Sequence, residues 1–248
     1  MTACNADSQQ NAGSGSRTVT MATSADYPPY EYVDSSSGNQ EIIGFDVDIA
    51  KEITSRLGYD LQIQNIDFNG LIPALQAKRA DFVMAGMTPT AERKQNVDFS
   101  RVYYEAKNTI VARQGSNLTT PESLKGKTVG VQLGTIQEGV ANDFNKEKNL
   151  GVNVKPLNRI NEIVQELKAG RIDAAIVEDT VAQGYTQSNP DLEFNTIPNE
   201  GEAGSAIAFP KGSELAPEFD RVLGEMIESG KVNELVNKWF TTSVQADK

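Results

Sequence analysis

The sequence contains no histidine and only one cysteine among its 248 residues. The absence of histidine excludes the Ser-His-Asp and Cys-His nucleophile systems, and it excludes histidine-ligated zinc or iron. A lone Cys4 can form neither an internal disulfide nor a thiolate metal cluster. Most hydrolytic mechanisms are thereby excluded, and we expect neither a bound metal nor a cofactor.

Basic residues and long apolar runs are also scarce. The chain has 23 Lys and Arg against 34 Asp and Glu, a net charge of −11. This balance argues against nucleic-acid binding, which depends on a basic surface. The apolar runs are far shorter than the roughly 18 residues of a membrane-spanning helix. At about 100 to 200 residues per domain, the length suits one large domain or two modest ones.

The first residues have the composition of a tether. Residues 5–17 lack large apolar side chains and are rich in Gly, Ser, Asn and Gln, which is typical of a flexible linker. The preceding Thr2-Ala3-Cys4 is similar to the end of a lipoprotein processing site. We expect residues 1–17 to be a tether with a lipid anchor at Cys4; an incidental cysteine in a disordered tail is the alternative.

Strands alternate with helices along the next part of the chain. The hydrophobic pattern predicts strands at 18–24, 60–66 and 81–85, and helices at 44–57 and 69–78. Such alternation predicts an α/β fold built on a mainly parallel sheet.

A weak internal repeat indicates two similar lobes. Residues 75–88 and 167–180 carry Leu, Ala, Arg, Asp and Thr at the same offsets, and each reads as a helix, an Arg-x-Asp turn and a short buried strand. Chance similarity between two common units is the alternative. Because ligands of open α/β sheets bind at the carboxyl ends of strands, the polar residues 86–88 and 178–180 are expected to face a cleft between the lobes.

The residues near these strand ends suit an amino-acid zwitterion. Arg93 follows the first strand end and can grip a carboxylate through two parallel hydrogen bonds. Glu178 or Asp179, after the second, can receive an ammonium group. Aromatic side chains in residues 24–32 and at Phe68 can sandwich a planar side chain. Backbone amides in residues 132–138 would also suit a carboxylate.

Several motifs, in order over residues 18–240, resemble those of the polar amino-acid-binding proteins of ABC importers. The resemblance is closest to the arginine and basic-amino-acid-binding lipoproteins of Gram-positive bacteria. The motifs are residues 24–32, 44–48, 67–75, 87–93, 98–100, 130–135 and 238–240.

The resemblance implies a two-lobed, type II periplasmic-binding-protein-like fold, in which each lobe is a mainly parallel sheet flanked by helices. Residues 18–109 and 206–248 would form the first lobe and residues 110–205 the second. The two hinge strands would lie near 110–112 and 206–209.

The resemblance also implies the roles of site residues. Arg93 would bind the ligand carboxylate with Thr88, Thr135 and Ile136, and Gly86 and Glu178 would bind the amino group. Tyr27 and Phe68 would stack on the ligand side chain. The full set of expected ligand-binding residues is Ser24, Tyr27, Glu31, Phe68, Ala85, Gly86, Thr88, Arg93, Gln132, Thr135, Ile136, Gln137, Glu178 and Asp179.

Two positions depart from the family pattern. Many basic-amino-acid binders have an aspartate in place of Ser24, where it meets the distal cation of the ligand. Either Glu31 compensates for this loss, or the ligand is neutral, such as glutamine. Glu178 replaces the commoner aspartate at the amino group, and an alignment shift of one residue would put Asp179 there.

The expected function is capture of an L-amino acid outside the cytoplasm, without catalysis, and delivery to the membrane subunits of an ABC importer. We expect arginine to be preferred over lysine, histidine and glutamine. The protein would be a monomer on the outer face of the cell membrane, or periplasmic in a Gram-negative cell. The alternatives are a glutamine-specific binder, a cyclohexadienyl dehydratase-like enzyme and a receptor sensing domain.

Overall fold

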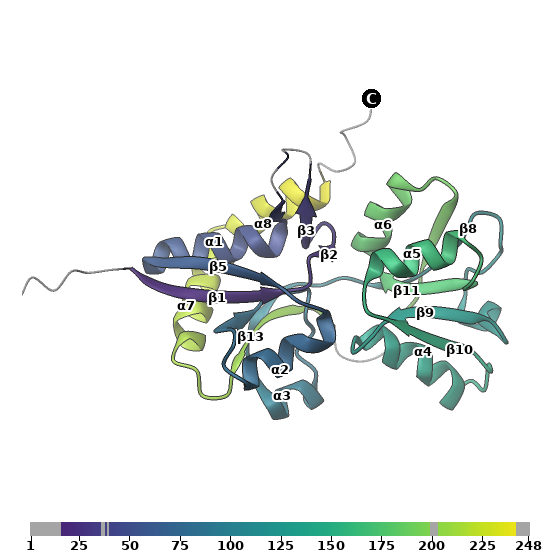
Figure 1. Cartoon of the computed structure of the whole chain (residues 1–248), viewed down its shortest axis with the longest axis horizontal. Helices are drawn as coiled ribbons and strands as arrows, with labels where there is room; N and C mark the ends of the chain where they lie inside the picture. Colours follow the sequence, from purple (N-terminus) through teal and green to yellow (C-terminus); the bar gives the residue numbers. More distant parts are fainter. Residues whose placement is uncertain (1–15, 36–37, 39, 199–202, 242–248) are drawn as a thin grey trace, which may run out of the picture.

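The computed structural model describes residues 16–35, 38, 40–198 and 203–241, and it contains two five-stranded sheets (Figure 1). In spatial order, the first sheet consists of β5 (Tyr59–Asn65), β1 (Arg17–Thr23), β6 (Phe82–Val83), β13 (Ser205–Pro210) and β7 (Val97–Tyr104). The second consists of β10 (Asn153–Leu157), β9 (Thr128–Gln132), β11 (Ala174–Glu178), β8 (Asn108–Arg113) and β12 (Leu192–Thr196). Each sheet is the centre of one lobe.

The two sheets have the same pattern of directions. The first three strands of each are parallel, and the fourth, β13 or β8, is antiparallel to both of its neighbours. That fourth strand is in each case the one by which the chain enters the sheet from the other lobe. The prediction of two α/β lobes is confirmed, and each sheet is mixed, with two parallel and two antiparallel pairings.

Helices cover both faces of each sheet. The helices of the first lobe are α1 (Phe45–Leu57), α2 (Leu71–Gln76), α3 (Ala91–Asn96), α7 (Leu215–Glu228) and α8 (Lys231–Val236). Those of the second are α4 (Ile136–Lys146), α5 (Ile160–Lys168) and α6 (Asp179–Ser188). The shorter elements are the sheet of β2 (Asp26–Tyr27), β3 (Glu31–Asp34) and β4 (Glu41–Ile43), the single turns Phe68–Gly70 and Pro121–Leu124, and a π-helical turn at Asn237–Thr241.

Alternating strand residues divide the core into layers. Phe82 of β6 packs with α1 and α7, whereas its neighbour Val83 packs with α2 on the opposite face of the first sheet. In the second lobe, Ala175 faces α5 and Ile176 belongs to the cluster that includes α4. Because both faces are covered, the central strands β8, β11 and β13 are buried along nearly their whole length, whereas the edge strand β5 alternates.

The internal repeat is also present in the structure. Asp81 precedes β6 and accepts a hydrogen bond of 2.7 Å from the N–H of Thr20 in β1. Asp173 precedes β11 and accepts one of 2.8 Å from the N–H of Thr128 in β9. The recurring aspartate therefore ties two parallel strands together at the same place in each lobe.

The predicted lobe boundaries differ from the sheets by one or two residues. Asn108 and Thr109 pair within β8 of the second sheet, and Ser205 pairs within β13 of the first. The apolar stretches 110–112 and 206–209 lie inside these strands. The hydrogen-bonded ladders begin earlier, at polar residues that hydrophobicity does not mark.

The loop after β2 is held against the start of α1. The N–H groups of Phe45 and Asp46 donate to the carbonyls of Pro29 and Tyr30, each at 2.9 Å. Gly44 makes this approach possible, since its φ is +140° and a Cβ there would lie 2.1 Å from the Tyr30 carbonyl oxygen. The contact brings β3 beside the first turn of α1.

Candidate functional site

All the expected ligand-binding residues except Asp179 line one cavity between the lobes. Most of them lie near the carboxyl ends of β1, β5, β6, β9 and β11, the edge where ligands of open α/β sheets bind, whereas Glu31 comes from β3 and Arg93 from α3. We call the space among them the inner cavity. Its lining residues are Ser24, Tyr27, Glu31, Phe68, Ala85, Gly86, Thr88, Arg93, Gln132, Thr135, Ile136, Gln137 and Glu178.

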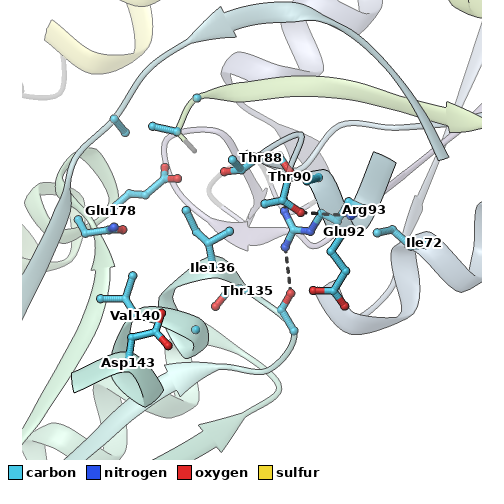
Figure 2. Close-up of a pocket in the computed structure, with 17 residues that line it drawn as sticks. Ile72, Thr88, Thr90, Glu92, Arg93, Thr135, Ile136, Val140, Asp143 and Glu178 are labelled. Atoms are coloured by element: carbon cyan, nitrogen blue, oxygen red, sulfur yellow. Dashed lines mark hydrogen bonds between the residues drawn. The ribbon is translucent and has the colours of Figure 1, made fainter. Parts of the chain in front are cut away.

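A wider space adjoins the inner cavity and opens to solvent. Figure 2 shows Arg93 and Glu178 on opposite sides of it. Both spaces are lined by Thr88, Arg93, Thr135, Ile136 and Glu178. A route from solvent to the inner cavity therefore passes these five residues.

Arg93 lies in the first turn of α3 and connects the two lobes. The N-cap residue Thr90 accepts a hydrogen bond from the backbone N–H of Arg93 at 3.2 Å. The guanidinium donates to the carbonyl of Thr88 at 2.9 Å and, across the cleft, to that of Gly134 at 2.9 Å (Figure 2). It also lies 5.4 Å from the centre of the Phe68 ring. Burial lowers the pKa of Arg93 to about 10, so the side chain stays charged at neutral pH.

The second lobe contributes polar groups from β9 and the start of α4. The side-chain amide of Gln132 donates to the carbonyl of Asn158 at 3.1 Å, and that of Gln137 donates to Asn108 at 3.0 Å. The backbone N–H of Gly134 donates to the Glu138 carboxylate at 2.8 Å. This amide, which lies in the stretch expected to bind a carboxylate, is therefore already engaged within its own lobe.

Two buried acids lie together at the side of the inner cavity formed by the first lobe. Glu31 of β3 and Asp46 of α1 are both 0% exposed. Asp46 accepts hydrogen bonds from the N–H of Gly86 at 2.9 Å and from the hydroxyl of Tyr103 at 2.8 Å. Burial raises the pKa of Asp46 to about 6. Burial, followed by the nearby charge of Asp46, raises the pKa of Glu31 well above its ordinary value.

Asp46 is not among the ligand-binding residues expected from the sequence, although the sequence contains a signal for it. Residues 46, 49, 50 and 53 lie on one side of α1, and all four are buried. A charged residue on the apolar stripe of a helix needs a buried partner, and this position therefore marks a candidate for function.

Glu178 and Asp179 are neighbours in sequence but have different surroundings. Glu178 ends β11 and lines the cavity, and burial raises its pKa to about 8. Asp179 instead accepts a hydrogen bond of 3.2 Å from the N–H of Lys107, in the segment that crosses from the first lobe to the second. Of the two alternatives, Glu178 lines the inner cavity, and the side chain of Asp179 holds the crossing segment.

The aromatic residues divide between site and core. Tyr27 and Phe68 line the inner cavity, each with 9% of its surface exposed. Tyr30 is fully buried among the rings of Phe45, Tyr104 and Phe240, as expected for a core residue. The planar faces available to a ligand therefore come from Tyr27 and Phe68.

Ser24 is already hydrogen-bonded, and its partner belongs to a contact between the lobes. The Ser24 hydroxyl donates to Asp26 at 3.0 Å, and the other carboxylate oxygen of Asp26 accepts from the N–H of Ile160 in the second lobe at 2.6 Å. Arg159 of the second lobe lies 3.6 Å from Asp26 and 2.6 Å from Asp67. We call the contacts of Asp26 and Asp67 with Arg159 and Ile160 the interlobe bridge. No sequence motif indicated it.

The described residues offer neither a metal site nor a membrane-spanning helix. They contain no group of three or more His, Cys, Asp or Glu side chains placed to hold a metal ion. No helix within the described ranges is long and apolar enough to cross a membrane. Cys4, the expected site of a lipid anchor, lies outside the described residues.

Sequence and structure comparisons agree on the relatives of this chain. Residues 19–242 match the bacterial extracellular solute-binding proteins, family 3. The arginine-binding extracellular protein ArtP of Bacillus subtilis (strain 168) is 48% identical over 243 residues, covering 97% of this chain and 92% of the relative.

Solved structures of binding proteins share the fold. The substrate-binding protein of an amino-acid ABC transporter has a TM-score of 0.86 and 44% identity, covering 90% of this chain and 99% of that protein. An ancestral arginine-binding protein has been solved with arginine and with glutamine. Both forms have a TM-score of 0.83 and 40% identity and cover 90% of this chain, with 98% and 97% of their own chains covered.

The family match extends over nearly the whole chain, and the relatives are substrate-binding proteins rather than enzymes. The expectation of a non-enzymatic binding protein is therefore confirmed. The chain is an extracytoplasmic binding protein and belongs to the bacterial extracellular solute-binding proteins, family 3.

Proposed function

We propose that this protein captures L-arginine in the inner cavity and delivers it to an ABC importer. The observation that carries the proposal is the distribution of charge along the cavity. Arg93 and Glu178 lie where the cavity meets the outer space, and the Glu31 and Asp46 pair lies at the side formed by the first lobe. In an amino acid with a cationic side chain, the carboxylate is complementary to Arg93, the ammonium group to Glu178, and the side-chain cation to the acid pair.

Each end of the ligand then has a chemical partner. Arg93, with Thr88, Thr135 and Ile136, would hold the α-carboxylate, while Glu178 and the backbone carbonyl of Gly86 would hold the α-ammonium. Tyr27 and Phe68 would stack on the side chain, with Ala85, Gln132 and Gln137 completing the wall. Glu31, rather than Ser24, would meet the distal cation. Buried charges are tolerated only when paired, so the ligand itself completes these pairs.

The comparisons support arginine over other amino acids. The B. subtilis relative is an arginine-binding protein, and the ancestral relative was solved with arginine bound. We propose the order arginine before lysine, histidine and glutamine. We also propose a monomer anchored by a lipid on Cys4, with the first lobe at 18–109 and 206–248 and the second at 110–205, each boundary adjusted to the strands described above.

Glutamine is the second candidate, and two observations favour it. Ser24 offers no negative charge, and the ancestral relative was also solved with glutamine. A protonated Glu31 would donate a hydrogen bond to the side-chain carbonyl of glutamine. The two candidates thus differ in the charge that Glu31 carries when the ligand is bound.

Titration calorimetry on protein stripped of ligand by unfolding and refolding tests the proposal. Arginine should bind more tightly than glutamine, and Arg93→Ala should weaken both by about 3 to 5 kcal/mol, because it removes one partner of a buried pair. Arg221→Ala, which removes an exposed arginine on α7, is the matched control and should leave both affinities unchanged. Unchanged affinity in Arg93→Ala would reject the proposed site, and tighter binding of glutamine would favour the second candidate.

A further inference from the structure

The carboxyl groups of Glu31 and Asp46 form a buried acid pair with unequal surroundings. Asp46 is stabilised as an anion by two donors, the N–H of Gly86 at 2.9 Å and the hydroxyl of Tyr103 at 2.8 Å. Neither oxygen of Glu31 accepts a hydrogen bond from any donor among the described residues. Glu31 lines the inner cavity, so it is the member of the pair that a ligand can reach.

The charges around the pair offer it no cation. The titratable groups that face it from neighbouring elements within the described chain are acids and phenols: Asp26 and Tyr27 of β2, Tyr103 of β7 and Glu178 of β11. Arg93 lines the same cavity but donates to the carbonyls of Thr88 and Gly134. Arg159 reaches Asp26 from the second lobe, within the interlobe bridge.

Two adjacent buried carboxylates cannot both ionise at low cost, so the pair holds a proton. Asp46 accepts two hydrogen bonds that favour its ionised form, whereas Glu31 accepts none from the described residues. The proton therefore resides on Glu31.

We propose that the acid pair exchanges this proton for the distal cation of the ligand, so that binding of arginine releases a proton that binding of a neutral analogue does not. The inference rests on the proposed function. The O–H bond of Glu31 breaks, the proton leaves to solvent, and the resulting carboxylate accepts two N–H bonds from the guanidinium. A neutral ligand instead accepts a hydrogen bond from the protonated Glu31. Asp46 acts as a positioning residue, because it fixes the proton on Glu31 in the free protein.

Citrulline is the matched ligand for the test, since it has the shape of arginine with a neutral ureido group. Arginine and citrulline have the same α-ammonium group, which Glu178 would bind. Any proton that Glu178 releases is therefore common to both ligands and cancels in the comparison. The dissociation constants of arginine and citrulline, measured by competition, should have a ratio that changes about tenfold for each pH unit below the pKa of Glu31 in the free protein, in favour of arginine at higher pH. Calorimetry in buffers of different ionisation enthalpy should count about one more proton released with arginine.

Three variants locate the effect. Glu31→Gln should abolish the excess proton and the pH dependence of the ratio. Asp46→Asn should move the pH dependence to lower pH, a change that a purely structural role would not produce. Glu52→Gln, on the exposed side of α1, is the control and should match the wild type.

The outcomes separate this inference from the function on which it rests. Equal proton release for arginine and citrulline in the wild-type protein, together with tight arginine binding, would overturn the proton exchange alone. Failure of the protein to bind arginine at any pH would overturn both. Because the wild-type comparison needs no variant, the inference stays falsifiable even if Glu31→Gln does not fold.

Discussion

The interlobe bridge should control how tightly every ligand is held. Arg159 contacts Asp67 at 2.6 Å, Asn65 at 3.1 Å and Asp26 at 3.6 Å, so three contacts join the lobes without touching the inner cavity. Arg159→Met keeps most of the apolar stem and removes the charge and all three contacts. We expect the substitution to destabilise the closed arrangement relative to an open one.

The size of the effect follows from the exposure of each contact. The side chain of Asp67 is 42% exposed, so its ion pair contributes about 0.2 to 1 kcal/mol. The hydrogen bond to Asn65 contributes about 0.5 to 1.5 kcal/mol. The contact with Asp26 is long but mostly shielded from water. A total of about 2 kcal/mol raises the dissociation constant about 30-fold when the free protein is mainly open.

Calorimetry with arginine on three proteins tests this reasoning. Arg171→Met is the matched control, because Arg171 pairs with Glu166 at 2.6 Å inside the second lobe. It should leave the affinity unchanged. A double-mutant cycle of Arg159→Met with Asp67→Asn should show coupling. Equal affinities for wild type, Arg159→Met and Arg171→Met would refute a role for the bridge in closure.

Three further predictions concern stability. Gly44→Ala should lower the free energy of unfolding, measured in urea, by at least about 3 kcal/mol, because the new Cβ would lie 2.1 Å from a backbone oxygen. Gly58→Ala, at φ +71° with no atom near the new Cβ, is the comparison and should cost about 1 kcal/mol. Asp81→Ala and Asp173→Ala should each cost about 1 to 3 kcal/mol by leaving a strand N–H unpaired, and a loss in only one of them would contradict their equivalence. The third prediction concerns pH. The pKa of Glu178 in the folded protein is raised from 4.5 to about 8. Between these two pH values the folded state therefore binds more protons than the unfolded state. Stability of the ligand-free protein should therefore fall as pH rises from about 5 to 8, Glu178→Gln should flatten the slope in thermal melts, and a rise over this window would contradict the assignment.

Features set by nearby residues were predictable from the sequence. The pattern at 44–57 predicted α1 at Phe45–Leu57, and Gly58 ends the helix in the left-handed conformation. The cavity-lining residues were predictable for a related reason. They follow strand ends, and parallel strands bring their carboxyl ends to one edge of a sheet, so Thr88 and Gln132 reach the cleft from their own lobes.

Features that depend on how distant elements dock were not predictable. Asp46 acquires its role from Gly86 and Tyr103, which are 40 and 57 residues away. Arg159 meets Asn65 across 94 residues. Glu178 and Asp179 could not be told apart, because one position along the chain decides whether a side chain enters the cavity or faces Lys107. Periodicity describes one element at a time and holds no information on such pairings.

The contacts of the cleft separate affinity from specificity. A contact that forms only when the lobes close, and that touches no ligand, changes the affinity for every amino acid by the same factor. The bond of Arg93 to the Gly134 carbonyl differs, because a ligand carboxylate competes for the same guanidinium. Glu31 is placed to act on the ligand side chain, and Asp46 sets the charge of Glu31. Substitutions in the interlobe bridge should therefore shift arginine and glutamine together, whereas substitutions in the acid pair should shift one against the other.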